Sequence, residues 1–95
     1  MEPFVLKKPV TFEGMTYESF DLSGLDELTG EQYASLLQET AKVEGETLVP
    51  EKTITFVYLT AAKVTGLPYD LFCTLKAKDA ARLRYEVGKY FLAED

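Results

Sequence analysis

The spacing of apolar residues changes once along this chain, and that change constrains the fold more than any other feature of the sequence. Residues 3–22 alternate between apolar and polar side chains, as strands do, whereas residues 29–92 repeat apolar side chains at helical spacing. The sequence therefore predicts an α+β fold, a β-hairpin followed by three helices (ββααα). A chain of 95 residues has the length of one domain, so residues 1–95 are expected to share a single core.

The hairpin is predicted within residues 1–22, with its reversal at residues 12–15. Gly14 provides the residue that most readily takes the positive φ of a tight reversal. The alternation slips by one step at Ser19-Phe20, which indicates either a β-bulge or a drift in strand register there. Pro9 has no N–H to donate to a neighbouring strand, so the first strand is expected to lie at a sheet edge or to end at this residue.

The helical part is predicted over residues 29–92 and begins with a clear start signal. Thr29 and Gln32 form a Thr-x-x-Gln capping box, which predicts a helix that runs to about Val43 and is stopped by Gly45. The residues expected on its inner face are Tyr33, Leu36, Leu37, Thr40 and Ala41.

Residues 51–65 combine strong β propensity with the length and the ends of a helix. Pro50 suits a first helical position, Gly66 suits the position just past the end, and Pro68 follows where a helix cannot continue. We therefore predict a helix. Its main apolar stripe consists of Ile54, Val57, Tyr58, Ala61 and Ala62. Because Phe56 and Leu59 lie off this stripe, the helix is expected to be buried on several sides or to lie in an oligomer interface.

The last helix is predicted over residues 77–92, after an apolar turn or single helical loop at residues 69–75. Its inner face is expected to hold Ala80, Leu83, Val87, Tyr90 and Phe91, and its outer face Lys78, Arg82, Glu86 and Lys89. Gly88 weakens a helix by about 0.5–1 kcal/mol relative to alanine, so close backbone packing is expected at this position.

The charge balance is acidic and argues against some classes of partner. The sequence has ten Lys and Arg residues and sixteen Asp and Glu residues, which gives a formal net charge of −6. Phosphate backbones repel such a surface, so no nucleic-acid partner is expected. The N-terminus carries no export signal and no segment has the apolar length of a membrane span, which predicts a cytoplasmic protein without a membrane partner.

The sequence contains no recognisable catalytic or metal-binding pattern. Histidine is absent, so the commonest general base and metal ligand are missing. Cys73 lies among Leu71, Phe72 and Leu75, which predicts an inert thiol in the core. The acidic clusters lack the spacing of a calcium loop, and the glycines lack that of a phosphate-binding loop. We expect no enzyme activity, no cofactor and no metal.

Protein contacts are the remaining candidate for function. Phe56, Leu59 and Tyr85 are the candidate contact residues, because the first two lie off their helix stripe and Tyr85 stands between Arg84 and Glu86. The apolar excess of the second helix also makes homo-oligomerisation plausible.

Three stretches of the chain, taken in order, resemble one protein family. The first is Leu6-Lys7-Lys8-Pro9-Val10-Thr11-Phe12-Glu13-Gly14, followed by Tyr17 and by the Asp21-Leu22 step. The second is Ala61-Ala62-Lys63-Val64-Thr65-Gly66-Leu67-Pro68. The third is Leu75-Lys76-Ala77-Lys78-Asp79-Ala80, continued by Val87 and Phe91-Leu92. Together they resemble the tail assembly chaperones of long-tailed bacteriophages and prophages, and they span most of the chain.

The resemblance implies a non-catalytic assembly factor in the cytoplasm of the host bacterium. Such chaperones bind the tape measure protein, keep it soluble and help to recruit the tail tube protein until polymerisation displaces them. Two alternatives stay open. A structural or adaptor protein of the phage particle would stay in the mature particle, whereas a chaperone would not. An enzyme with carboxylates in a cleft between subunits would need raised carboxyl pKa values there.

Overall fold

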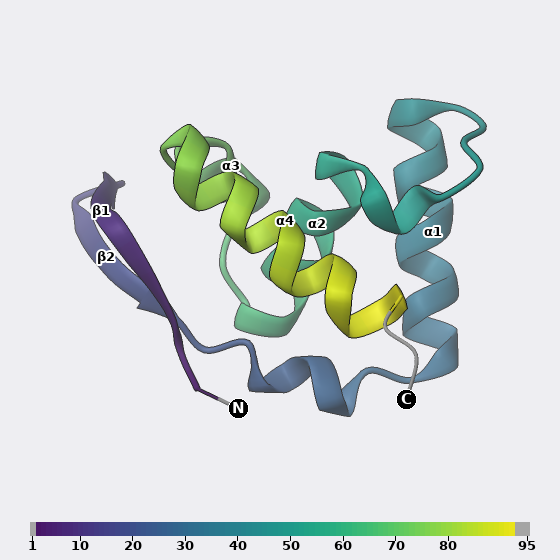
Figure 1. Ribbon diagram of the computed structural model, residues 1–95, viewed down its shortest axis with the longest axis horizontal. Coiled ribbons are helices and arrows are strands. Elements are labelled where there is room, and N and C mark those ends of the chain that lie inside the picture. Colours follow the sequence, from purple (N-terminus) through teal and green to yellow (C-terminus); the bar gives the residue numbers. More distant parts are fainter. Residues whose placement is uncertain (1, 93–95) are drawn as a thin grey trace.

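The computed structural model describes residues 2–92 and has the predicted α+β architecture, a hairpin followed by helices. The element order is β1 (Phe4–Phe12), β2 (Met15–Phe20), the 3-10 segment η1 (Ser23–Glu27), α1 (Gly30–Glu44), the 3-10 segment η2 (Pro50–Lys52), α2 (Ile54–Thr65), α3 (Tyr69–Cys73) and α4 (Ala77–Leu92). Figure 1 shows the hairpin and α1 at opposite ends of the molecule, with α2, α3 and α4 between them.

The hairpin closes through a two-residue turn at Glu13 and Gly14. Both residues have positive φ, +50° and +82°, and the flanking pair Phe12 and Met15 is in register. Two positive φ values in succession match the twist of antiparallel strands, which is why glycine is suited to the second position. The predicted reversal at Gly14 is confirmed.

The hairpin is irregular in β1, not at the predicted place in β2. Val5 pairs with Ser19, but the next pair is Val10 with Tyr17, so four residues of β1 lie opposite a single residue of β2. A bulge at Ser19-Phe20 is therefore wrong, because both residues are regularly paired, but the register does change directly after the Val5–Ser19 pair. Pro9 lies in the irregular part of β1, where its missing N–H removes no regular ladder bond.

Helix α1 begins and ends where its sequence signals predicted. The Thr29 hydroxyl accepts from the Gln32 N–H at 3.2 Å, and Gln32 Oε1 accepts from the Thr29 N–H at 3.0 Å, which completes the capping box. Gly45 has a φ of +75° and ends the helix. Leu36 and Thr40 of the predicted inner face are buried, whereas Ala41 is exposed.

Helix α2 is confirmed as a helix that is buried on several sides, but its start and the exposure of Ile54 differ from the prediction. Pro50 begins the separate segment η2, and Thr53 caps α2 by accepting from the Phe56 N–H at 3.2 Å. The fully buried residues of α2 include Phe56, Val57 and Ala61, whereas Ile54 is 38% exposed. Because α2 is covered from several sides, its buried face is rotated toward Phe56 relative to the predicted stripe.

Helices α3 and α4 follow a glycine-terminated α2 and complete the core. Gly66 ends α2 in the left-handed conformation, and Pro68 precedes α3, as their positions in the sequence indicated. The core joins buried residues of the hairpin, η1 and the helices: Phe4, Leu6, Val10, Phe20, Leu22, Leu25, Leu36, Phe56, Val57, Ala61, Leu71, Phe72, Leu75, Ala80, Leu83 and Val87.

The predicted close packing at Gly88 is wrong. A Cβ built on Gly88 would meet nothing within 4 Å, whereas one built on Gly24 would lie 3.0 Å from the Val64 carbonyl oxygen. The close approach of backbone to backbone therefore joins η1 to α2, and Gly88 is free of such a constraint. Within residues 2–92, no helix is both long and apolar enough to cross a membrane.

Candidate functional site

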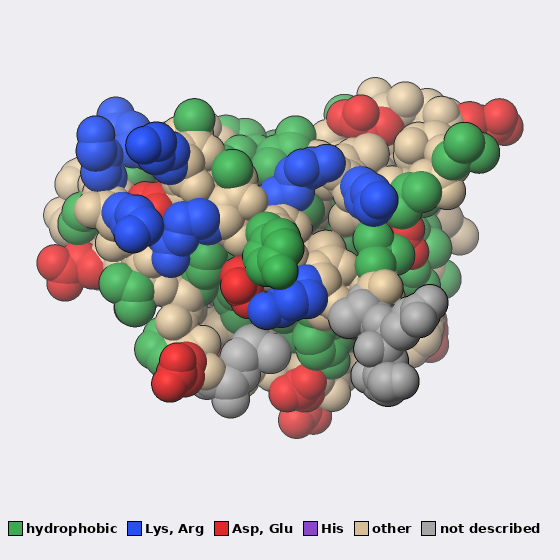
Figure 2. Space-filling view, in the orientation of Figure 1, with side chains coloured by type: hydrophobic (Ala, Val, Ile, Leu, Met, Phe, Trp, Pro, Cys, Tyr) green, Lys and Arg blue, Asp and Glu red, His purple; other side chains and the backbone are tan. Residues whose placement is uncertain are grey.

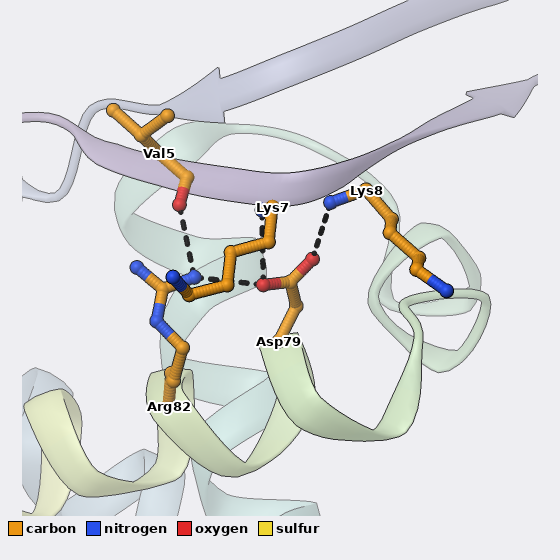
Figure 3. A network of polar contacts seen from close by, with 5 residues as sticks. All are labelled: Val5, Lys7, Lys8, Asp79 and Arg82. Atoms are coloured by element: carbon orange, nitrogen blue, oxygen red, sulfur yellow. Dashed lines mark hydrogen bonds and ion pairs between the residues drawn. The ribbon is translucent and has the colours of Figure 1, made fainter.

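A buried carboxylate, Asp79, and its partly exposed ion-pair partner, Arg82, attach the irregular part of β1 to α4. Asp79 is 1% exposed and accepts from two successive backbone amides, Lys7 N–H at 3.1 Å and Lys8 N–H at 3.0 Å. Arg82 Nη1 donates to Asp79 Oδ1 at 2.7 Å and to the Val5 carbonyl at 3.0 Å (Figure 3). Where the β1–β2 ladder is interrupted, backbone N–H and C=O groups of β1 therefore form hydrogen bonds with side chains of α4 instead of with β2.

The environment of Asp79 favours the charged carboxylate. Burial opposes ionisation, but the hydrogen bonds from the Lys7 and Lys8 amides, together with the hydrogen bond and charge of Arg82, hold the Asp79 pKa below its ordinary value of 3.8. The Arg82 guanidinium also lies 4.8 Å from the centre of the Phe4 ring. With all of its contacts made inside the fold, Asp79 positions the hairpin on α4.

The opposite side of α4 carries an open groove. Ala81, Tyr85, Gly88 and Leu92 follow one another along the helix surface at intervals of four, three and four residues and line a hollow of about 460 Å³. The other lining residues are Lys52, Arg84 and Lys89. We call this hollow the α4 groove. Tyr85 is 67% exposed and also borders a second hollow of about 820 Å³ that extends to the N-terminal end of β1.

The α4 groove lies within a basic face of an acidic protein. Of the ten Lys and Arg residues, β1 contributes two, η2 one and the segment from Lys76 to Lys89 five. Figure 2 shows blue Lys and Arg side chains gathered over α4 and the neighbouring hairpin, with a few red acidic side chains among them. Arg84 Nε donates to the Lys52 carbonyl at 2.7 Å, which links η2 to α4, and Lys89 Nζ lies 5.4 Å from the centre of the Tyr85 ring.

The three predicted contact residues lie in different environments. Phe56 is fully buried, with its ring 5.3 Å from that of Phe91, so the expectation of an exposed Phe56 is wrong. Leu59 is half-buried and packs against the core. Tyr85 is exposed, as predicted. The expectation of self-association rested on the exposed apolar surface of α2. The burial of Phe56 reduces that surface, but self-association itself is not tested and stays a prediction.

Cys73 does not lie in the core, which corrects the prediction. Its neighbours Leu71 and Phe72 are buried, but Cys73 is on the outer side of the short helix α3 and is exposed. Partial burial of the thiol, with the nearby Asp70 charge, raises the Cys73 pKa, so the thiol lacks the activation of a nucleophile.

A second polar contact joins α1 to η2. The Tyr33 hydroxyl donates to the Glu51 carboxylate. Burial, together with this hydrogen bond and the Glu51 charge, raises the pKa of Tyr33 to about 12. Within residues 2–92, no group of three His, Cys, Asp or Glu side chains is placed to hold a metal ion.

Sequence reasoning found Tyr85 but missed the groove around it. The signal was present, because Ala81, Tyr85, Gly88 and Leu92 repeat at helical spacing on the side of α4 away from Leu83 and Val87. The two small residues made this second stripe hard to recognise as apolar. Compared with known proteins, the chain matches no family model, no curated protein and no solved structure.

Proposed function

We propose that this protein is a non-catalytic tail assembly chaperone of a long-tailed bacteriophage or prophage, which binds the tape measure protein and keeps it soluble. The observation that carries the proposal is where the three stretches resembling that family lie in the fold. Gly14 forms the hairpin turn, Gly66 and Pro68 form the elbow between α2 and α3, and Asp79 joins the hairpin to α4. The shared residues are therefore those that determine this architecture.

The exposed side of α4 supports a role in binding protein. On this side, the aromatic Tyr85 is 67% exposed and the aliphatic Leu92 is 41% exposed. An apolar groove bordered by charge is suited to covering an apolar helix face, and the formal net charge of −6 opposes aggregation of the resulting complex.

Two carboxyl groups with shifted acidity make contacts within the fold. The Asp79 pKa is lowered by its backbone and Arg82 hydrogen bonds, and the Asp21 pKa is lowered by hydrogen bonds from Ser23. A carboxyl group that serves as a general acid near neutral pH needs a shift in the opposite direction. The proposal places the protein in the cytoplasm of the host bacterium, with the tape measure and tail tube proteins as partners.

Co-expression with the tape measure protein of the same genome tests the proposal. We expect the tape measure protein to be insoluble alone and to become soluble and co-purify when this chain is present. The matched control co-expresses the tape measure protein with an unrelated acidic domain of similar size, which separates specific binding from a general effect of added charge. A tape measure protein that stays insoluble and unbound would refute the chaperone function.

The composition of mature particles distinguishes a chaperone from a structural or adaptor protein. A chaperone is displaced as the tail tube polymerises, so mass spectrometry of purified particles should detect the tape measure and tube proteins without this chain. Its presence at a fixed ratio to the tube protein would favour the structural alternative.

A further inference from the structure

The α4 groove has the spacing of a helix-docking surface. Ala81, Tyr85, Gly88 and Leu92 repeat at four, three and four residues, which is the seam spacing along which two helices pack. The inner side of the same helix is occupied by the core, where Leu83 and Val87 are fully buried. Helix α4 therefore has two apolar sides, and its own chain covers one of them.

Gly88 makes the groove deep enough for close contact. A glycine within a helix costs about 0.5–1 kcal/mol relative to alanine, and nothing in the fold requires it, because a Cβ at Gly88 would meet no atom within 4 Å. Its effect is to leave open space on the outer side of α4 between Tyr85 and Leu92. A partner helix can approach the α4 backbone at this point.

The charge of the groove identifies the kind of helix that fits. Lys52, Arg84 and Lys89 line it, and the acidic Glu86 pairs with Lys89 at 3.5 Å from outside the lining. Lys52 comes from η2, so the positive charge borders the apolar stripe from a second element as well as from α4 itself. Acidic side chains on both sides of an apolar stripe would complement this arrangement.

Among residues 2–92, a second copy of this chain presents no exposed helix of that kind. Helix α1 presents Glu31, Glu39 and Glu44 to solvent, but Val43 is its one large apolar residue with high exposure, at 67%. Leu48, fully exposed, lies in the loop after α1 and not on a helix. The charge of α1 would suit the groove, whereas its apolar surface would not.

We propose that the α4 groove docks an acidic amphipathic helix of a partner protein. This deepens the proposed function and rests on it for the identity of the partner, because it assigns both the binding surface and the chemistry of the segment bound. Tyr85 and Leu92 contact the apolar stripe of the partner helix, Gly88 admits its backbone, and Lys52, Arg84 and Lys89 pair with its carboxylates.

Binding of two synthetic helical peptides tests the proposal without the tape measure protein. Both carry leucines at heptad seam spacing; one has glutamates beside the seam and the other has lysines in their place. Titrated into the isotopically labelled full-length protein, the glutamate peptide should bind with a dissociation constant below about 1 mM. It should shift the amide signals of Ala81, Tyr85, Gly88 and Leu92, and the lysine peptide should not bind.

Two pairs of matched variants locate the binding. Arg84→Glu with Lys89→Glu should weaken it at least tenfold, whereas Lys42→Glu with Lys63→Glu, at the exposed ends of α1 and α2, changes the net charge equally and should weaken it less than twofold. Gly88→Ala and Gly88→Leu both improve helix propensity, but only leucine fills the groove. Gly88→Ala should therefore weaken binding, because its methyl group limits the approach of the partner backbone, and Gly88→Leu should abolish it.

Several results would overturn the proposal. The groove would not be a site for an acidic helix if neither peptide binds, if both bind equally, or if the signal shifts lie away from α4. The charge argument would fail if the two charge-reversal pairs weaken binding equally. The occupant would be a different one if self-association of the protein or a single-stranded oligonucleotide displaces the peptide. If the groove variants lose the peptide but retain the tape measure protein, the partner uses another surface. If the peptide binds as expected and the tape measure protein does not, the groove stands and the chaperone function fails.

Discussion

Replacing Asp79 by asparagine should remove the contact that holds the hairpin on α4. The carboxylate is 1% exposed and accepts from the Lys7 and Lys8 amides on separate oxygens. Asparagine keeps the size of the side chain but has one acceptor oxygen and one NH₂ group. One of the two backbone amides would then face another donor and lose its partner, while the other would keep a weaker, neutral hydrogen bond.

The expected cost of Asp79→Asn is about 2–4 kcal/mol. The amide that loses its partner lies in a part-buried contact, where an unpaired donor costs about 1–3 kcal/mol, and weakening the second hydrogen bond adds about 1 kcal/mol. The loss of the ion pair adds little to this sum, because the Arg82 side chain is 38% exposed and is screened by solvent. For a domain whose total stability is of order 5–15 kcal/mol, the loss should lower the melting temperature by roughly 10–25 °C.

The pH dependence provides an independent check of the mechanism. The Asp79 pKa is lowered in the folded protein, so its ionisation stabilises the fold above the ordinary carboxyl pKa of 3.8. This contribution is lost as the pH falls through the folded value. The difference in unfolding free energy between wild type and Asp79→Asn should therefore be complete at pH 7 and should shrink below about pH 4.

Urea denaturation of wild type, Asp79→Asn and Asp70→Asn at several pH values measures these quantities. Asp70 is exposed in the first turn of α3, so Asp70→Asn should cost less than about 1 kcal/mol. Hydrogen exchange at the Lys7 and Lys8 amides should become faster in Asp79→Asn alone. A loss below about 1 kcal/mol at Asp79, or a difference that does not change between pH 7 and pH 3, would refute this account of how the hairpin is held.

Three further predictions concern packing and turns. Phe56→Ala should cost about 3–5 kcal/mol of unfolding free energy, because Phe56 is fully buried. Tyr85→Ala should cost less than about 1 kcal/mol, because Tyr85 is 67% exposed. Thermal denaturation that ranks the two variants in the reverse order would contradict these environments. Glu13→Asn should raise stability by up to about 1 kcal/mol, since Glu13 has a φ of +50° in the hairpin turn, and an unchanged melting temperature would show that this φ carries no strain. Gly66→Ala should cost about 1 kcal/mol by equilibrium unfolding, because Gly66 has a φ of +72°; a stabilised variant would contradict the left-handed end of α2.

The ends of the elements could be predicted because their signals are local. The Thr29 capping box, the hairpin turn at Gly14 and the end of α2 at Gly66 each depend on a few neighbouring residues, and each lies where the sequence placed it. The start of α2 was predicted too early, at Pro50. A proline that suits a first helical position also suits a separate 3-10 turn, and Thr53 makes the better cap.

The directions of the buried faces could not be predicted in the same way. Helical spacing gives the period of α2, but it does not show which sides the rest of the chain covers, and Phe56 is buried because Tyr33 of α1 and Phe91 of α4 meet it there. The position of the bulge depended on a contact across more than seventy residues, between Lys7 and Asp79. No local pattern records such a pairing.

The arrangement of α4 separates stability from binding, and this makes the proposed surface testable by substitution. Leu83 and Val87 are fully buried on one side, and Asp79 holds the hairpin at the start of the helix, so changes at these positions act on the fold. Changes at Tyr85 or Gly88 act on a side that the chain leaves open. Suppose a variant on this side no longer binds a partner but keeps its unfolding free energy. The substituted residue then contacts that partner, because the core that positions the groove is unchanged.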